Sequence, residues 1–144
     1  MKNVDKAVSC FKEGFSCSQA VLSAYAEQLG LDMNNALKVS GTFGGGMAGM
    51  AETCGAVTGA FMVIGLKYGK IKPEDEESKR KAYALVKEFV EEFKAKNSSI
   101  VCKELLGCDI STSQGIQEFK DKNFINTVCP GLVKDAAEIL EEFL

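Results

Sequence analysis

Glycine is concentrated in one segment of this sequence, and that feature most limits how the chain can fold. Nine of the 14 glycines lie between Gly41 and Gly69, and Glu52 is the only charged residue from Val39 to Leu66. Glycine weakens helices but lets another backbone or a ligand approach closely. Glu52 also divides the apolar run into pieces shorter than the roughly 20 residues of a membrane span. We therefore predict no membrane span and a buried, glycine-rich helix at the centre of the fold.

Apolar residues recur at helical spacing through most of the remaining sequence. Ser16 and Gln19 form a capping-box pattern, Asp32 is a candidate N-cap, and Pro73 suits a first helical turn. The pattern predicts a loop at 41–49, one or two helical turns within 109–125, and helices at 2–13, 16–29, 32–39, 50–68, 73–96, 99–106 and 129–144. No strand-like alternation is present. We expect a single all-α domain over residues 1–144, a bundle of about six to seven helices.

Composition narrows the classes of function. The chain has 144 residues, a net charge of −3 and no basic run, so we do not expect nucleic acid as a partner. The first residues lack the apolar segment of a secretion signal, which favours a cytoplasmic protein. Six cysteines in a reducing compartment more often bind metal or do redox work than form structural disulfides. Because there is no histidine, a Cys–His nucleophile pair and a c-type haem attached through C-x-x-C-H are excluded.

Three cysteines lie near predicted helix starts. Cys17 is expected at the first position of its helix, Cys102 near the third position after Ser99, and Cys129 near the N-cap of the last helix. Free N–H groups and the positive end of the helix dipole stabilise a thiolate, which is the reactive and metal-binding form. Cysteines also fill small gaps in cores. On position alone, the functional and the packing interpretations are about equally supported.

Cys54 lies inside the glycine-rich segment. Gly55 and Gly59 share a helix face, and small residues at this spacing allow either close helix packing or a cofactor beside the sulfur. The backbone N–H groups of the preceding glycine run could cradle an anion, although no G-K-[ST] motif follows. We interpret Glu52 as a surface acid. The candidate cofactor-binding positions are therefore Gly44, Gly45, Gly46, Gly55 and Gly59.

The cysteine spacing does not match a zinc finger, because no C-x-x-C pair is present. Four separated cysteines can still meet at the ends of packed helices and bind a metal ion or an iron–sulfur cluster. Cys102 and Cys108 could pair if the chain turns back at Gly107, and Cys10 is expected in the core.

Four motifs resemble, in order and over nearly the whole chain, the C_GCAxxG_C_C family of redox-active proteins. They are "EGFSCSQAVL", "GTFGGGMAGMAETCGAVTGA", "CKELLGCDI" and "CPGLVKDAAEIL". The family label writes Gly-Cys-Ala where this chain reads Cys54-Gly55-Ala56. The resemblance implies a small helical protein with redox or metal-linked chemistry, some members being associated with transporter loci. It carries the hallmark cysteines to Cys17, Cys54, Cys102 and Cys129, with Cys108 as a weaker fifth.

Three functions remain open. The leading hypothesis is thiol/disulfide or electron-transfer chemistry by Cys17, Cys54, Cys102 and Cys129, with Cys17–Cys54 and Cys102–Cys129 as the expected pairs. The second is a metal or iron–sulfur centre ligated by the same four cysteines, with Cys108 as a weak further ligand. The third is a non-catalytic helical module that binds a small molecule. The expected partner is a small molecule or a redox partner protein, and the glycine-rich helix packs either within one chain or across the twofold axis of a homodimer.

Overall fold

The computed structural model describes residues 2–144, and its regular elements are helices, as expected for an all-α protein. The elements are α1 (Lys2–Lys12), α2 (Cys17–Ala26), the 3₁₀ turn η1 (Glu27–Leu29), α3 (Met33–Ser40), α4 (Gly55–Tyr68), α5 (Glu76–Asn97), α6 (Cys102–Leu106), α7 (Ser113–Asp121), α8 (Phe124–Thr127) and α9 (Cys129–Glu141). The expected bundle is confirmed. Residues 109–125, expected to hold one or two helical turns, contain the nine-residue helix α7 and the start of the short helix α8.

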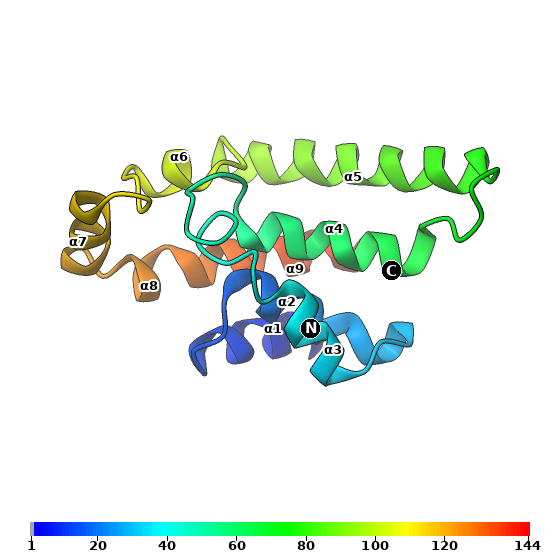
Figure 1. Cartoon of the computed structure of the whole chain (residues 1–144), viewed down its shortest axis with the longest axis horizontal. Helices are drawn as coiled ribbons and strands as arrows, with labels where there is room; N and C mark the ends of the chain where they lie inside the picture. The colour runs from blue at the N-terminus through cyan, green and yellow to red at the C-terminus, as the bar shows by residue number, and fades with distance from the viewer. Residues whose placement is uncertain (1) are drawn as a thin grey trace.

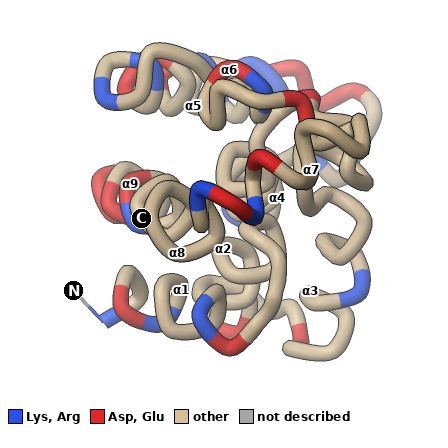
Figure 2. Tube along the Cα trace, turned by 90° about the vertical axis from the view of Figure 1, so that its left-hand side faces the viewer, with Lys and Arg blue, Asp and Glu red and all other residues tan. Residues whose placement is uncertain are grey.

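The glycine-rich helix α4 lies at the centre of the bundle, as predicted. It contacts α2, α5 and α9. Figure 1 shows α5 along one side of α4 and α9, with α1, α2 and α3 on the other side. Because neighbours cover α4 on several sides, the helix is apolar around most of its circumference and carries a single charged residue, Lys67. Helix α2 has no charged residue, and its trace is tan throughout in Figure 2.

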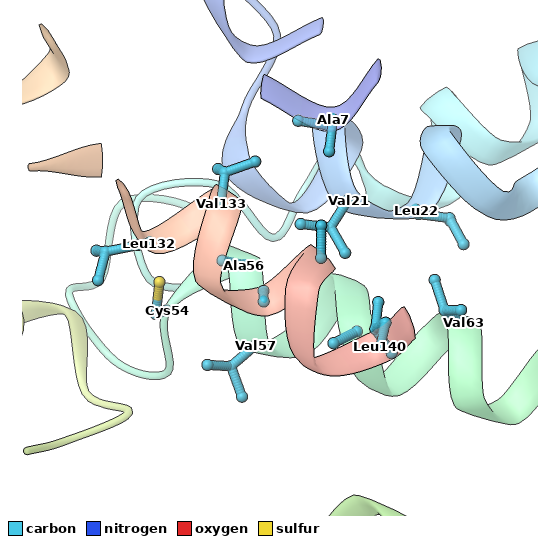
Figure 3. Close-up of a cluster of buried hydrophobic side chains, with 14 of the residues drawn as sticks. Ala7, Val21, Leu22, Cys54, Ala56, Val57, Val63, Leu132, Val133 and Leu140 are labelled. Atoms are coloured by element: carbon cyan, nitrogen blue, oxygen red, sulfur yellow. The ribbon is translucent and has the colours of Figure 1, made fainter. Parts of the chain in front are cut away.

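Close packing of α2 against α4 depends on Gly59. A Cβ atom at this position would lie 2.9 Å from the carbonyl oxygen of Ser18 and 3.1 Å from Cβ of Val21. Figure 3 shows Val21 of α2 near α4 in a cluster of buried side chains that also includes Val57. Gly59 is therefore a packing position, whereas a Cβ at Gly65 of the same helix would meet nothing within 4 Å.

Helices α4, α5 and α6 begin three or more residues later than predicted, and α6 begins at Cys102 rather than at residue 99. Helix α4 begins at Gly55 rather than near residue 50, because the backbone just before it is extended and Thr53 forms an antiparallel bridge with Val101. Helix α5 begins at Glu76, after Pro73, because the Asp75 carboxylate accepts the N–H of Ser78 at 3.0 Å and so caps the helix three residues later than the proline suggested.

No helix within residues 2–144 combines the length and apolar character needed to cross a bilayer.

Candidate functional site

The four hallmark cysteines each lie at a helix N-terminus. Cys17 is the first residue of α2, as predicted, because Ser16 and Gln19 form a reciprocal capping box. Cys102 and Cys129 are the first residues of α6 and α9, so their expected positions, the third position and the N-cap, shift by one or two residues. Cys54 was expected inside a helix and is instead the N-cap of α4.

These helix starts come together around one cavity of about 450 Å³. Helices α4 and α9 run away from the end of the molecule where α6, α7 and α8 lie (Figure 1). In Figure 3, Cys54 lies at the edge of the buried cluster near Leu132, which also lines the cavity. The structure thus brings the four candidate residues to one place, and the cavity is lined by Cys17, Cys54, Cys102 and Cys129.

Backbone pairing holds the segments of Cys54 and Cys102 side by side. The Cys54 N–H donates to the carbonyl oxygen of Ile100 at 2.8 Å, and the Cys102 N–H donates to the carbonyl oxygen of Glu52. These two bonds flank the bridge between Thr53 and Val101. The pairing fixes the starts of α4 and α6 relative to each other although 47 residues separate the two cysteines in the sequence.

The glycine run before Cys54 forms a left-handed turn. Residues 45–49 all have positive φ, including the non-glycine residues Met47 (φ 70°) and Ala48 (φ 54°). A left-handed conformation costs a non-glycine residue roughly 1–2 kcal/mol. Gly46 cannot be replaced without strain, since a Cβ there would lie 2.7 Å from Cβ of Cys102 and 2.7 Å from the backbone nitrogen of Glu52. The turn therefore packs its backbone directly against the start of α6.

The candidate glycines divide between cavity and core. Gly44, Gly45, Gly46 and Gly55 line the cavity, and Gly59 does not. Among the described residues, no acceptor is found for the backbone N–H groups of Gly44, Gly45 and Gly46. The binding of a ligand by these N–H groups stays a prediction.

Burial controls the pKa of two of the thiols. Burial raises the pKa of Cys54 to about 11, although the backbone N–H groups of Ala56 and Val57 act in the opposite direction. Burial also raises the pKa of Cys102 to about 12, with further increases from the neighbouring cysteines. The expectation that a helix start lowers the thiol pKa is therefore wrong for Cys102, because the loss of solvent outweighs the helix terminus, and burial has the same effect at the N-cap Cys54.

Cys17 and Cys129 form a coupled pair. The side chains of Cys17 and Cys129 are in hydrogen-bonding contact, which raises the pKa of Cys17, and burial raises it further. The same contact lowers the pKa of Cys129 despite its burial. At this pair Cys129 is thus the group that ionises first and Cys17 the group that keeps its proton. The expected pairs, Cys17–Cys54 and Cys102–Cys129, stay predictions, since all four of these cysteines are free thiols.

The remaining thiols lie elsewhere. All six cysteines, each within the described residues, are free. Cys108 is buried but does not line the cavity, and Cys10 is half-buried and within 3.4 Å of the Ser23 hydroxyl. Glu52 is exposed, as predicted. Within residues 2–144, no group of three or more Cys, Asp or Glu side chains has the arrangement of a metal-ion site.

Sequence reasoning did not identify the apolar wall of the cavity. Phe11, Phe15, Phe119 and Ile125 line it beside the cysteines. Two of them are large apolar side chains with substantial exposure, 36% for Phe15 and 47% for Ile125. An apolar residue left exposed is visible only once the fold is known, so the sequence carried no signal for this wall.

Comparison with known proteins gives one match. The sequence profile of the family described as "Putative redox-active protein (C_GCAxxG_C_C)" matches residues 15–143, which include all four cavity cysteines. No curated protein and no solved structure matches the chain.

Proposed function

The chain belongs to the C_GCAxxG_C_C family, and from this premise we propose that it is a thiol redox protein whose reactive pair is Cys17 and Cys129. The contact between the Cys17 and Cys129 side chains, which lie at the starts of α2 and α9 on the wall of one cavity, carries the proposal. It joins a thiol that keeps its proton to a sulfur that loses its own more easily, in a cavity large enough for a reactant. This is the arrangement that thiol–disulfide exchange needs.

The residues have distinct roles in the exchange. The Cys129 thiolate attacks one sulfur of a substrate disulfide, a mixed disulfide forms, and the first substrate thiolate leaves with a proton from the solvent. Cys17 then loses its proton and attacks the Cys129 sulfur, which releases the second substrate thiolate. The products are the Cys17–Cys129 disulfide and two substrate thiols. Cys54 and Cys102, whose pKa values are about 11 and about 12, stay protonated and act as neighbours of the reaction.

Disulfide mapping of the native protein tests this proposal. Stepwise oxidation, alkylation and peptide mass spectrometry are expected to show Cys17–Cys129 as the first disulfide to form. Cys129→Ser is expected to abolish it, and Cys17→Ser to trap the mixed disulfide on Cys129. Cys10→Ser serves as the matched control, because Cys10 is half-buried and lies outside the cavity. A first disulfide that does not join Cys17 to Cys129 would overturn the assignment of the pair.

A second candidate function is the binding of an iron–sulfur cluster. The observation in its favour is that four helix-start thiols line the same cavity. Cysteine thiolates are the ligands of such clusters, which supply one-electron transfer when bound, but within residues 2–144 no three of these side chains have the arrangement of a metal-ion site. The residues that would hold it are Cys17, Cys54, Cys102 and Cys129. Anaerobic purification with iron and sulfide analysis tests this candidate. A protein without iron and sulfide that takes up no cluster on reconstitution would exclude it.

Both candidate functions use the cavity thiols chemically, whereas a module that only binds a small molecule would not. A reducing cytoplasm would keep all six thiols reduced until a specific oxidant arrives. If none of the four cavity cysteines reacts with oxidant or binds a cluster, and if their replacement changes only stability, the chain is instead a module that binds a small molecule without chemistry.

A further inference from the structure

We propose that the oxidant admitted to the cysteine cavity is a small, uncharged and largely apolar quinone, which accepts two electrons from the Cys17–Cys129 dithiol. This inference rests on the proposed function, because it names the substrate class of the same site. It follows from the absence of charge in the cavity, from the apolar wall, and from the free backbone N–H groups of the glycine turn.

The cavity carries no charged side chain. Among the described residues that line it there is no Lys, Arg, Asp or Glu, although these types make up 26% of the chain. A cationic ligand would find no acidic side chain there, and a fully charged anion would meet only backbone N–H groups and helix dipoles, with no Lys or Arg to balance the cost of its burial. Oxidants that carry carboxylates or phosphates are therefore disfavoured at this site.

The wall suits a flat apolar ring. Phe11 and Phe119 line the cavity, and Ile125 and Phe15 expose apolar surface there. Aromatic and aliphatic side chains bind rings through stacking and dispersion contacts. The volume, about 450 Å³, lies in the range of small-molecule sites and can hold a one-ring or two-ring compound with short substituents.

Polar groups in the cavity are matched to oxygen atoms that become negative during the reaction. The N–H groups of Gly44, Gly45 and Gly46 have no acceptor among the described residues, and the helix starts of α2, α4 and α9 bring the positive ends of their dipoles to the same place. Such donors bind a neutral carbonyl oxygen and bind it more strongly as negative charge develops. A quinone is neutral when oxidised and gains this charge on its carbonyl oxygens when reduced.

The oxidation of the two thiols is balanced with the quinone as the only oxidant. The Cys129 thiolate adds to a ring carbon of the quinone and forms a carbon–sulfur bond. Cys17 gives up its proton and attacks the Cys129 sulfur, so that a sulfur–sulfur bond forms and the carbon–sulfur bond breaks. The electron pair stays on the ring, which takes one proton from Cys17 and one from solvent. One quinone and two thiols become one hydroquinone and the Cys17–Cys129 disulfide.

Matched oxidants test the substrate class on the full chain. Duroquinone is compared with its analogue that carries a propionate in place of one methyl group, and dithiodiethanol is compared with dithiodipropionate. Formation of the Cys17–Cys129 disulfide is followed by mass spectrometry, and each rate is divided by the rate of the same oxidant with dithiothreitol. We expect duroquinone to give the highest normalised rate, about tenfold or more above its anionic analogue.

The outcomes separate this inference from the proposed function. Equal rates with neutral and anionic quinones would overturn the requirement for an uncharged substrate. A higher normalised rate with dithiodiethanol would overturn the assignment to quinones and leave the thiol chemistry in place. If no oxidant closes the Cys17–Cys129 disulfide, the proposed function itself fails.

A charge placed at the cavity wall gives an independent readout. Ile125→Asp puts a carboxylate beside the cavity, and Ile116→Asp is its matched control, since Ile116 is similarly exposed (42%) and does not line the cavity. We expect Ile125→Asp to lower the rate with duroquinone about tenfold and Ile116→Asp to leave it unchanged, with both variants showing wild-type circular dichroism. Equal rates in the two folded variants would contradict the location of the site.

Discussion

The buried thiol of Cys54 is expected to make the fold less stable at alkaline pH. Burial raises its pKa from 9.0 to about 11, and Cys54 is only 5% exposed. Between pH 9 and about pH 11 the folded chain therefore keeps the Cys54 proton, which the unfolded chain has already lost. This contribution is fully present below pH 9 and is lost as the pH rises toward 11. At pH 10 the expected loss is about 1.4 kcal/mol relative to pH 7, since one pKa unit corresponds to about 1.36 kcal/mol.

Urea unfolding in the presence of a reductant measures this loss. The free energy of unfolding of wild type and of Cys54→Ala is determined by circular dichroism at pH 7 and at pH 10. Other groups also titrate in this range, and burial raises the pKa of Tyr25 as well. Their effect is shared by both proteins and cancels, except for Cys102, whose pKa the Cys54 thiolate raises. We expect the loss between the two pH values to be smaller in Cys54→Ala by about 1.4 kcal/mol.

A second variant separates titration from the loss of packing. Val57 is fully buried on the same helix and has no ionisable group, so Val57→Ala is expected to lower stability at both pH values and to keep the wild-type pH dependence. If Cys54→Ala lost as much stability as wild type between pH 7 and pH 10, the thiol would ionise inside the fold as readily as outside it. The argument that burial controls the pKa of the cavity thiols would then be refuted.

Three further substitutions test the backbone that builds the site. Gly59→Ala is expected to lower stability by about 1–3 kcal/mol in thermal unfolding, because its Cβ meets the Ser18 carbonyl oxygen. The control Gly65→Ala should be neutral or gain up to about 1 kcal/mol. Equal effects of the two substitutions would contradict the close contact of α2 and α4. Gly46→Ala is expected to cost about 2–4 kcal/mol in urea unfolding, and an unchanged midpoint would show that the left-handed turn is not required. Asp75→Ala should cost about 1 kcal/mol by removing the N-cap of α5, and its failure to lower the unfolding midpoint would place the helix start elsewhere.

Local signals in the sequence were sufficient for most helices. The Ser16–Gln19 capping box and the Asp32 N-cap form as predicted, because each involves groups only three residues apart. The largest failure lies where distant segments compete with the local pattern. The pattern predicted a helix from residue 50, but the backbone before Gly55 pairs with the segment around Val101, and that pairing is not encoded near either segment.

The candidate site shows the same division between local and distant effects. The sequence by itself determined the helical elements, the lack of charge around Cys54 and the placement of Cys17, Cys102 and Cys129 near helix starts, because these features depend on neighbouring residues. Only the tertiary structure decided that Cys54 joins them at a helix start, that the side chains of Cys17 and Cys129 are in contact, and that the four thiols line one cavity with an apolar wall. Hydrogen bonds between distant residues and the exclusion of solvent are properties of the packed chain, and they set the pKa order of the four thiols.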